Sequence, residues 1–290
     1  MEELQYLDLI NTIAQKGVQR EDRTKIGTYS LFCPNPLRFS LENDKMPLLT
    51  TKQMPWKTVI KELLWFLRGE TNAKILQQQG VKIWDGNSSR EFLDARGLSN
   101  YPDGELGPIY GFNFRHFGAH YEPSNKEHKG GVDQIAYLID TLKTDPFSRR
   151  LVLSAWNPCD LAKCALPPCH MFFELYVTPE KSLSLHFHMR SSDVFLGLPF
   201  NIFSYAVLLR ILACKTGMQA KEVIVTFGDA HIYKNHIDQV KLQLERKPFD
   251  FPTMQMSKDV ETLDFHQIDI KHFKLIDYKS YETLKAPMAV

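Results

Sequence analysis

One cysteine stands beside residues that could support covalent chemistry. Cys169 follows two prolines and precedes a histidine within residues 165–170, and residues 190–201 supply a guanidinium, two hydroxyls, a carboxylate and a carboxamide. This set suits nucleophilic attack on a small anionic molecule. Because a free thiol is largely protonated at neutral pH, such a nucleophile needs a positive neighbour, and Arg190 is the nearest candidate. The alternative interpretation is a small, buried apolar residue without chemistry.

The other cysteines show no comparable pattern, and we assign them structural roles. They are Cys33, Cys159, Cys164 and Cys214. An odd total of five, with no apolar run behind the acidic N-terminus, predicts free thiols in a reducing compartment. No second cysteine pair at zinc spacing accompanies Cys159 and Cys164, so we expect no structural zinc site.

Four arginines could hold a phosphate dianion if the fold brings them together. They are Arg23, Arg149, Arg150 and Arg190. Guanidinium groups bind phosphate through paired hydrogen bonds, so their convergence would form a strong anion site. Four unrelated surface arginines are the alternative, and the residues alone leave both interpretations open.

Two polar residues in apolar segments suggest acid–base chemistry and base recognition. Glu62 lies on an otherwise apolar predicted helix, where burial would raise its pKa into the range useful for proton transfer. A solvated helix face is the alternative. Asn201 offers a donor and an acceptor that match the edge of uracil. It could also cap a helix that starts near Ile202.

His186 and His188 share one face of a predicted strand, a spacing that could begin a metal site. No further ligand follows at a fixed spacing, so we expect no metal and assign both histidines to solvent or to an interface.

Composition narrows the class of protein. The chain has 290 residues, with 35 Lys and Arg against 34 Asp and Glu and a net charge of +1, which argues against a nucleic-acid-coating protein. The most apolar stretch, residues 195–214, contains Pro199 and Arg210 and predicts a buried helix, not a membrane span. We expect residues 1–290 to form one catalytic domain without membrane association.

Hydrophobic periodicity predicts long helices and several strands. Helices are expected at 3–16, 56–67 and 133–143 and from 202 to a Gly217 cap, with strands within 27–39 and at 151–156, 171–177, 182–190 and 223–227. Residues 86–131 predict loop with short helices. The pattern lacks a regular βαβ repeat and favours an α+β (α/β) fold, with a mixed, mostly antiparallel β-sheet packed with long helices.

The segments 165–170 and 190–201 closely resemble the nucleophile and substrate segments of the thymidylate synthase family, and the resemblance covers nearly the whole chain. It implies a methyltransferase that converts dUMP to dTMP through a covalent adduct between Cys169 and C6 of the pyrimidine. The co-substrate would be 5,10-methylenetetrahydrofolate, which donates the carbon and the reducing equivalents and leaves as dihydrofolate, without a metal. The resemblance also implies a homodimer formed through one sheet face, in the cytoplasm or, for a eukaryotic or viral source, also in the nucleus.

The resemblance assigns roles residue by residue. Its catalytic set is Cys169, Glu62, Tyr110, Trp84, His170, Asp193 and Asn201. Its dUMP-binding set is Arg23, Arg149, Arg150, Arg190, Ser191, Ser192, Asp193, Asn201, His231 and Tyr233, with Arg149 and Arg150 donated across the dimer interface. Its folate-binding set is Ile83, Trp84, Leu166, Asp193, Gly197, Phe200 and Ala289.

Some positions depart from the family pattern. His188 and Met189 stand where the family has Tyr-Gln, and Gln53 stands where an arginine often meets the folate tail. The alternatives are therefore a dUMP or dCMP 5-hydroxymethylase of the same fold and a non-catalytic nucleotide-binding homologue. Asn201 and the tail at residues 285–290, which resembles the closing tail of the family, favour methylation.

Overall fold

The computed structural model describes residues 2–123 and 128–288. Ala289, which the resemblance assigns to the folate site, lies outside the described residues, as does the end of the expected closing tail.

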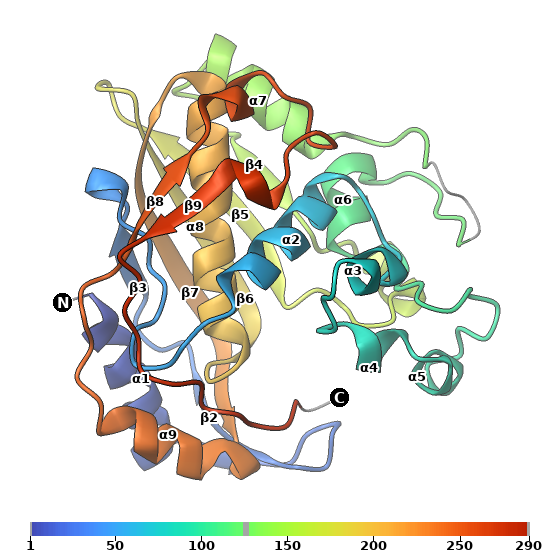
Figure 1. Ribbon diagram of the computed structural model, residues 1–290. Helices are drawn as coiled ribbons and strands as arrows, with labels where there is room; N and C mark the ends of the chain where they lie inside the picture. Colours follow the sequence, from blue (N-terminus) through green and yellow to red (C-terminus); the bar gives the residue numbers. More distant parts are fainter. Residues whose placement is uncertain (1, 124–127, 289–290) are drawn as a thin grey trace.

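Long helices and one large sheet make up most of the described chain (Figure 1). The α-helices are α1 (Glu3–Lys16), α2 (Trp56–Leu67), α3 (Lys74–Gln78), α4 (Asp85–Ser88), α5 (Arg90–Ala95), α6 (Tyr110–His116), α7 (Gln134–Thr144), α8 (Gly197–Thr216) and α9 (Ile237–Leu244). The strands are β1 (Val18–Arg20), β2 (Thr28–Phe32), β3 (Leu37–Ser40), β4 (Val152–Ser154), β5 (His170–Val177), β6 (Ser182–Asp193), β7 (Gln219–Tyr233), β8 (Thr253–Met256) and β9 (Phe273–Ile276). This content confirms the α+β prediction.

The main sheet has the strand order β1-β2-β7-β6-β5-β4, with β3 also paired to β7, and β8 and β9 form a separate ribbon. Among the strands of residues 2–123 and 128–288, only β6 and β7 pair in parallel, and the other neighbours are antiparallel. Parallel pairing places Asp193 opposite His231, and antiparallel pairing places His170 opposite Met189. The start of β5 therefore meets the far ends of β6 and β7, where most of the candidate site residues lie.

Helix α8 is the core helix of the molecule. It packs on β6 and β7, and α2 lies across it on the side away from the sheet (Figure 1). Apolar residues surround nearly its whole circumference because it is covered on both sides. By length and composition alone it could cross a membrane, but most of its apolar window is buried, as in the core helices of folded domains. The expectation of a buried helix here is confirmed.

The predicted start of this helix was wrong. We expected it near Ile202, with Asn201 as a cap in the alternative interpretation, whereas α8 begins at Gly197 and Asn201 lies inside it. Proline is tolerated in the first turn of a helix, where the missing N–H has no partner to lose, so Pro199 does not delay the start. The predicted end is correct, since Gly217 adopts a left-handed φ of 65° and caps the helix.

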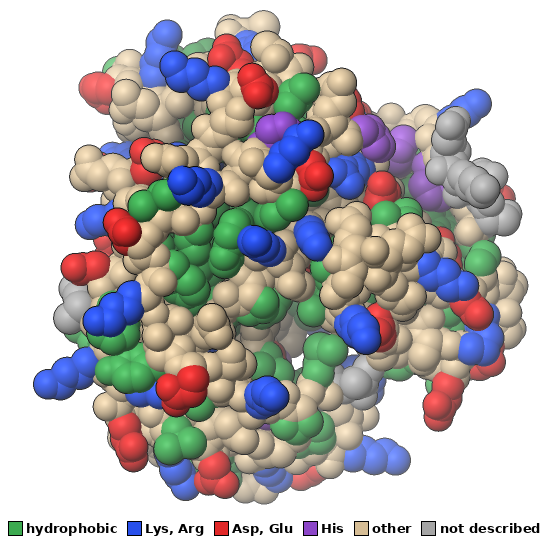
Figure 2. Space-filling model, viewed as in Figure 1, with side chains coloured by type: hydrophobic (Ala, Val, Ile, Leu, Met, Phe, Trp, Pro, Cys, Tyr) green, Lys and Arg blue, Asp and Glu red, His purple; other side chains and the backbone are tan. Residues whose placement is uncertain are grey.

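The alternation predicted for β6 is confirmed. Leu185, Phe187 and Met189 are buried, while His186 and His188 point to the other face and both bond Thr226 of β7, at 2.7 and 2.9 Å. Among the described residues, no group of three or more His, Cys, Asp and Glu side chains is arranged to hold a metal ion. On the face drawn in Figure 2, basic and acidic side chains are interspersed, without a continuous patch of one sign.

Candidate active site

Arg190 fastens the segment that carries Cys169. Its backbone N–H donates to the Cys169 carbonyl at 2.9 Å, and its side chain donates to the carbonyls of Pro168 and Pro167 at 2.7 and 3.0 Å. The Cys169 N–H donates to the hydroxyl of Tyr110 at 2.7 Å. The residue is partly exposed, and its backbone is held from two sides.

Burial and the nearby charges shift the pKa of Cys169 in opposite directions. Burial raises the pKa of the thiol, Arg190 lowers it, Asp193 raises it and Arg23 lowers it. The net result is a pKa above the ordinary value, because desolvation exceeds the help from the two guanidinium groups. The thiol is therefore held protonated in the free protein, and the arginines are the groups that favour the thiolate.

His170 is a buried, neutral neighbour of the nucleophile. Its ring stacks on Tyr110 with centroids 3.9 Å apart and an angle of 10° between planes, and its Nδ1 lies 2.8 Å from the Tyr205 hydroxyl. Burial lowers the pKa of His170 to about 3, so the imidazole is uncharged at neutral pH. This geometry suits positioning of Tyr110 better than proton transfer.

Glu62 has the protonation behaviour of an acid–base group. It accepts a hydrogen bond from the indole N–H of Trp84 at 2.7 Å. Burial raises the pKa of Glu62 to about 7, although the Trp84 hydrogen bond acts in the opposite direction. Both protonation states are therefore accessible near neutral pH, which is the condition for efficient proton transfer. Trp84 also packs 6.4 Å from Tyr110, ring to ring, and links Glu62 to the nucleophile segment.

Asp193 connects β6 to the start of α8. Its carboxylate accepts from the N–H groups of Phe195 and Leu196 at 3.0 and 3.1 Å. A Cβ added at Gly197 would lie 3.7 Å from the Asp193 Cβ and 3.9 Å from Oδ1 of Asn201. Asp193 and Asn201 therefore face the same small region beside Gly197.

Lys52 is a buried residue near Asp193 that the sequence did not suggest. Its ammonium donates to the carbonyl of Phe195 and lies 3.8 Å from the centre of the Phe195 ring. Burial lowers the pKa of Lys52 to about 7, while Asp193 and Glu3 act in the opposite direction. Lysines are mostly exposed in folded proteins, so the sequence around Lys52 gives no indication that this cation is buried near Asp193.

His231 and Tyr233 lie at the end of β7, beside Asp193. His231 is buried and its Nδ1 is 2.9 Å from Asp229, whose other oxygen pairs with Arg20 at 2.7 Å. The hydrogen bond from His231 is the largest cause of the lowered pKa of Asp229. Asp229 and Arg20, which the sequence did not suggest, thus orient the histidine by a polar chain that reaches the surface.

The four arginines do not converge within one chain. Arg190 lies at the nucleophile, and Arg23 is exposed and close enough to influence Cys169. Arg149 and Arg150 lie exposed between α7 and β4, and Arg149 lines a separate cavity of about 540 Å³ with Tyr176 and other residues on the outer side of the sheet.

The remaining predicted residues differ in exposure. Ser192 is fully buried, and its hydroxyl has no hydrogen-bond partner among the described residues. Ser191, Ile83, Leu166 and Phe200 are half-buried, so apolar side chains are accessible next to polar ones.

The site therefore has the parts of an enzyme that attacks a small anion with a cysteine. Comparison with known proteins identifies its family. The thymidylate synthase family model matches residues 4–290. The thymidylate synthases of Saccharomyces cerevisiae and Homo sapiens are each 48% identical to the chain, over 100% and 99% of it and 97% and 91% of their own lengths.

A longer relative matches equally well. The bifunctional dihydrofolate reductase-thymidylate synthase of Leishmania amazonensis is 50% identical over 100% of the chain, which spans 55% of that relative. The chain belongs to the thymidylate synthase family, whose members are methyltransferases that form dTMP from dUMP with a folate co-substrate.

Proposed function

We propose that this chain catalyses the reductive methylation of dUMP to dTMP, using 5,10-methylenetetrahydrofolate and releasing dihydrofolate. The observation that carries the proposal is the arrangement around Cys169, where Arg190 and Tyr110 hold the nucleophile at the meeting point of β5 and β6. The match to the family over residues 4–290 supports the same reaction.

Covalent attack by Cys169 begins the reaction. The Cys169 thiol releases its proton to solvent, and the resulting thiolate is favoured by Arg190 and Arg23. The thiolate Sγ then forms a bond to C6 of dUMP, and the electron pair of the C5–C6 double bond moves toward C4–O4 as an enolate. The phosphate dianion of dUMP pairs with the guanidinium groups of Arg190 and Arg23. Closure of the site around the nucleotide removes water. Glu62, with a pKa near 7, supplies a proton at O4 and can recover it later.

The folate supplies the one-carbon unit and the hydride when bound. Ile83, Trp84, Leu166 and Phe200 provide an apolar surface for its ring, and Asp193 provides a hydrogen-bond acceptor. Tyr110, whose pKa is raised well above the ordinary value, remains a neutral hydroxyl beside Cys169 and can orient a water for removal of the C5 proton. Exclusion of water by this wall favours the methylated product over a hydroxymethylated one.

The complete phosphate site requires a second copy of the chain. Arg149 and Arg150 are both exposed, and Arg149 lines a cavity that does not include Cys169 of its own chain. The lining of the same cavity exposes large apolar groups, with Tyr176 68% and Val152 42% exposed, as expected of a surface that another subunit covers. A symmetric homodimer through this face would donate both arginines to the partner's site. We place the protein in the cytoplasm, and also in the nucleus for a eukaryotic or viral source.

Product analysis tests the proposal. Purified protein is incubated with dUMP and methylenetetrahydrofolate, and the nucleotide and the folate are identified by mass spectrometry. We expect dTMP and dihydrofolate in equal amounts. Hydroxymethyl-dUMP with tetrahydrofolate would instead establish a hydroxymethylase, and unchanged dUMP would contradict both activities and favour a binding role.

A further inference from the structure

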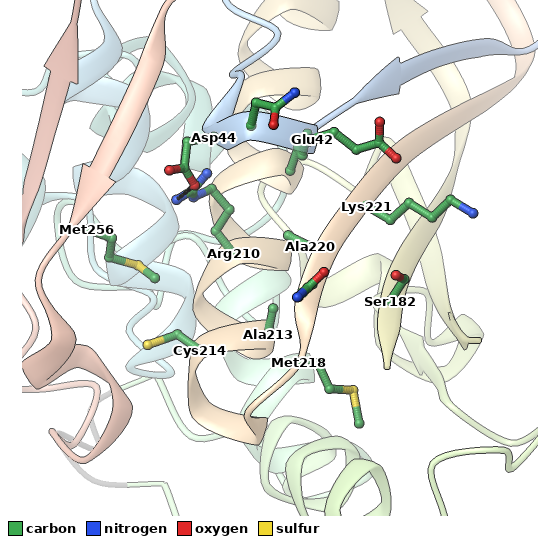
Figure 3. A pocket seen from close by; sticks show the side chains of 13 residues that line it. Glu42, Asp44, Ser182, Arg210, Ala213, Cys214, Met218, Ala220, Lys221 and Met256 are labelled. Carbon is green, nitrogen blue, oxygen red and sulfur yellow. Dashed lines mark hydrogen bonds and ion pairs between the residues drawn. The ribbon is translucent and has the colours of Figure 1, made fainter. Parts of the chain in front are cut away.

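Two polar side chains of α8 lie in contrasting surroundings. Toward the C-terminal end of the helix, Arg210 pairs with the exposed Asp44 at 2.7 Å and lines a cavity of about 550 Å³ (Figure 3). Tyr205, nearer the middle of the helix, is only 4% exposed. A buried phenol hydroxyl requires a hydrogen-bond partner, and here that partner belongs to the segment of the nucleophile.

Tyr205 bonds His170, the residue that follows the nucleophile. The hydroxyl oxygen of Tyr205 and Nδ1 of His170 are 2.8 Å apart, and this bond joins α8 to the start of β5. Two phenylalanines of the sheet hold the tyrosine ring. Phe187 stacks on it with ring centres 4.1 Å apart, and Phe173 meets it roughly edge to face at 5.7 Å. Packing thus fixes the hydroxyl relative to His170.

The proton of this hydrogen bond belongs to the tyrosine. Burial raises the pKa of Tyr205 and lowers the pKa of His170 to about 3, so a neutral phenol faces a neutral imidazole. Among the described residues, the Tyr205 hydroxyl has no acceptor besides Nδ1 of His170. A buried hydroxyl proton without an acceptor is unfavourable, so the phenol donates and Nδ1 accepts. His170 is then the tautomer that carries its proton on Nε2.

The second ring nitrogen of His170 is available to a ligand. The two nitrogens of an imidazole point in nearly opposite directions, so Nε2 faces away from Tyr205. It bonds none of the other described residues and is not among their fully buried polar atoms without a partner, and His170 as a whole is 7% exposed. The ring therefore presents an accessible N–H next to Cys169 and next to Tyr110, which stacks on it with ring centres 3.9 Å apart.

We propose that Tyr205 is a positioning residue for the reaction and acts through His170. Its hydroxyl fixes His170 as the tautomer protonated on Nε2, and His170 then offers a neutral hydrogen-bond donor on the pyrimidine side of the site. Such a donor stabilises negative charge that develops on the pyrimidine during attack, without giving up its proton. The inference rests on the proposed methylation of dUMP, whereas the tautomer is a property of the free protein.

Nuclear magnetic resonance of the full chain with 15N-labelled histidine measures the tautomer without turnover. The His170 signals are assigned by their loss in His170→Gln. We expect Nε2 to show the chemical shift of a protonated ring nitrogen and Nδ1 that of an unprotonated one. In Tyr205→Phe, which removes only the hydroxyl, the two shifts should move toward each other as both tautomers become populated. Protonation of the wild-type ring on Nδ1, or unchanged shifts in the variant, would overturn the proposal.

Kinetics separate this role from a purely structural one. Tyr205→Phe should lower kcat at least about tenfold and change the KM for dUMP less than about threefold, because the donor acts on charge formed during the reaction. Tyr101→Phe is the matched control, since Tyr101 is 5% exposed and its hydroxyl donates to the Lys163 carbonyl at 2.8 Å. The control should keep the wild-type kcat and the wild-type His170 shifts.

An equal fall in kcat in both variants, or a change in KM alone in Tyr205→Phe, would reject the positioning role. If Tyr205→Phe does not fold, the wild-type shifts decide, since a proton on Nδ1 rejects the assignment. Failure of the proposed function is distinct, because wild-type protein would then form no dTMP whatever the tautomer of His170.

Discussion

Cys169 and Cys214 lie near opposite ends of the unit formed by β6, α8 and β7, and both are partly exposed. Burial is the largest cause that raises the pKa of each thiol. The difference lies in the neighbours: Arg190 leads the opposing causes at Cys169, whereas Glu261 raises the pKa of Cys214 further, before Lys215 and Arg210 lower it. The two thiols therefore differ in the charged groups fixed around them as well as in how deeply they are buried.

Backbone anchoring separates the two regions further. The Cys169 segment is held by Tyr110 and by Arg190. Cys214 is a residue of a regular helix. A reactive cysteine here thus depends on cations and hydroxyls already in place, which is the preorganisation that catalysis requires.

The largest expected effect comes from removing the nucleophile. Cys169→Ser should lower kcat by at least about 10⁴-fold, since a hydroxyl is far less ionised than a thiol, while dUMP still binds. Turnover and equilibrium binding of dUMP measure the two effects. Cys159→Ser, at an exposed thiol, is the matched control and should keep full activity. Substantial turnover by Cys169→Ser would remove the distinction between this cysteine and the others.

Glu62→Gln should reduce kcat by roughly 10²–10⁴-fold by removing the proton relay. The same change should raise the free energy of unfolding at neutral and higher pH. Burial raises the pKa of Glu62 from 4.5 to about 7, so in this window the folded state keeps a proton that the unfolded state has lost, and stability falls as pH rises. Above pH 7 the glutamine variant should be more stable by up to about 3 kcal/mol.

Urea unfolding of both proteins at several pH values measures this second effect. A wild-type stability that does not fall between pH 5 and 7 relative to the variant would show that Glu62 ionises normally, as a solvated residue does.

Asn201→Asp should move the preference of the site from dUMP toward dCMP, by on the order of 10²-fold in the ratio of kcat/KM values. A carboxylate accepts a hydrogen bond from the cytosine amino group but offers no donor to uracil O4. Competition between the two nucleotides in one assay gives the ratio directly. An unchanged ratio would mean that another residue of this region reads the base.

Arg20→Gln removes the ion pair between Arg20 and Asp229 at the surface of the candidate site, and it should have the smallest effect on activity. Arg20 is 60% exposed and pairs with Asp229, which orients His231. Exposed ion pairs contribute about 1 kcal/mol or less, so we expect little loss of stability and a KM for dUMP raised by less than about tenfold, with kcat unchanged. A large fall in kcat would instead place this surface pair within the catalytic machinery.

The amino-acid sequence by itself determined the helices and strands whose apolar residues repeat regularly. Helices α1 and α2 and the alternation of β6 follow directly from side-chain periodicity, because one buried face suffices to define each element. The sequence also indicated the family and Cys169, since a thiol between Pro-Pro and His, followed by Arg190 and Asp193, is a local and distinctive arrangement.

Only the tertiary structure decided which polar side chains are buried and with whom. Lys52 is joined to Phe195, and Asp229 to Arg20, by contacts between residues far apart in the chain. Asn201 could be read as a cap until packing showed that α8 starts at Gly197. Desolvation and charge pairing depend on distances across the fold, which local sequence does not encode, so the protonation states of Glu62 and His170 emerge only in the folded chain.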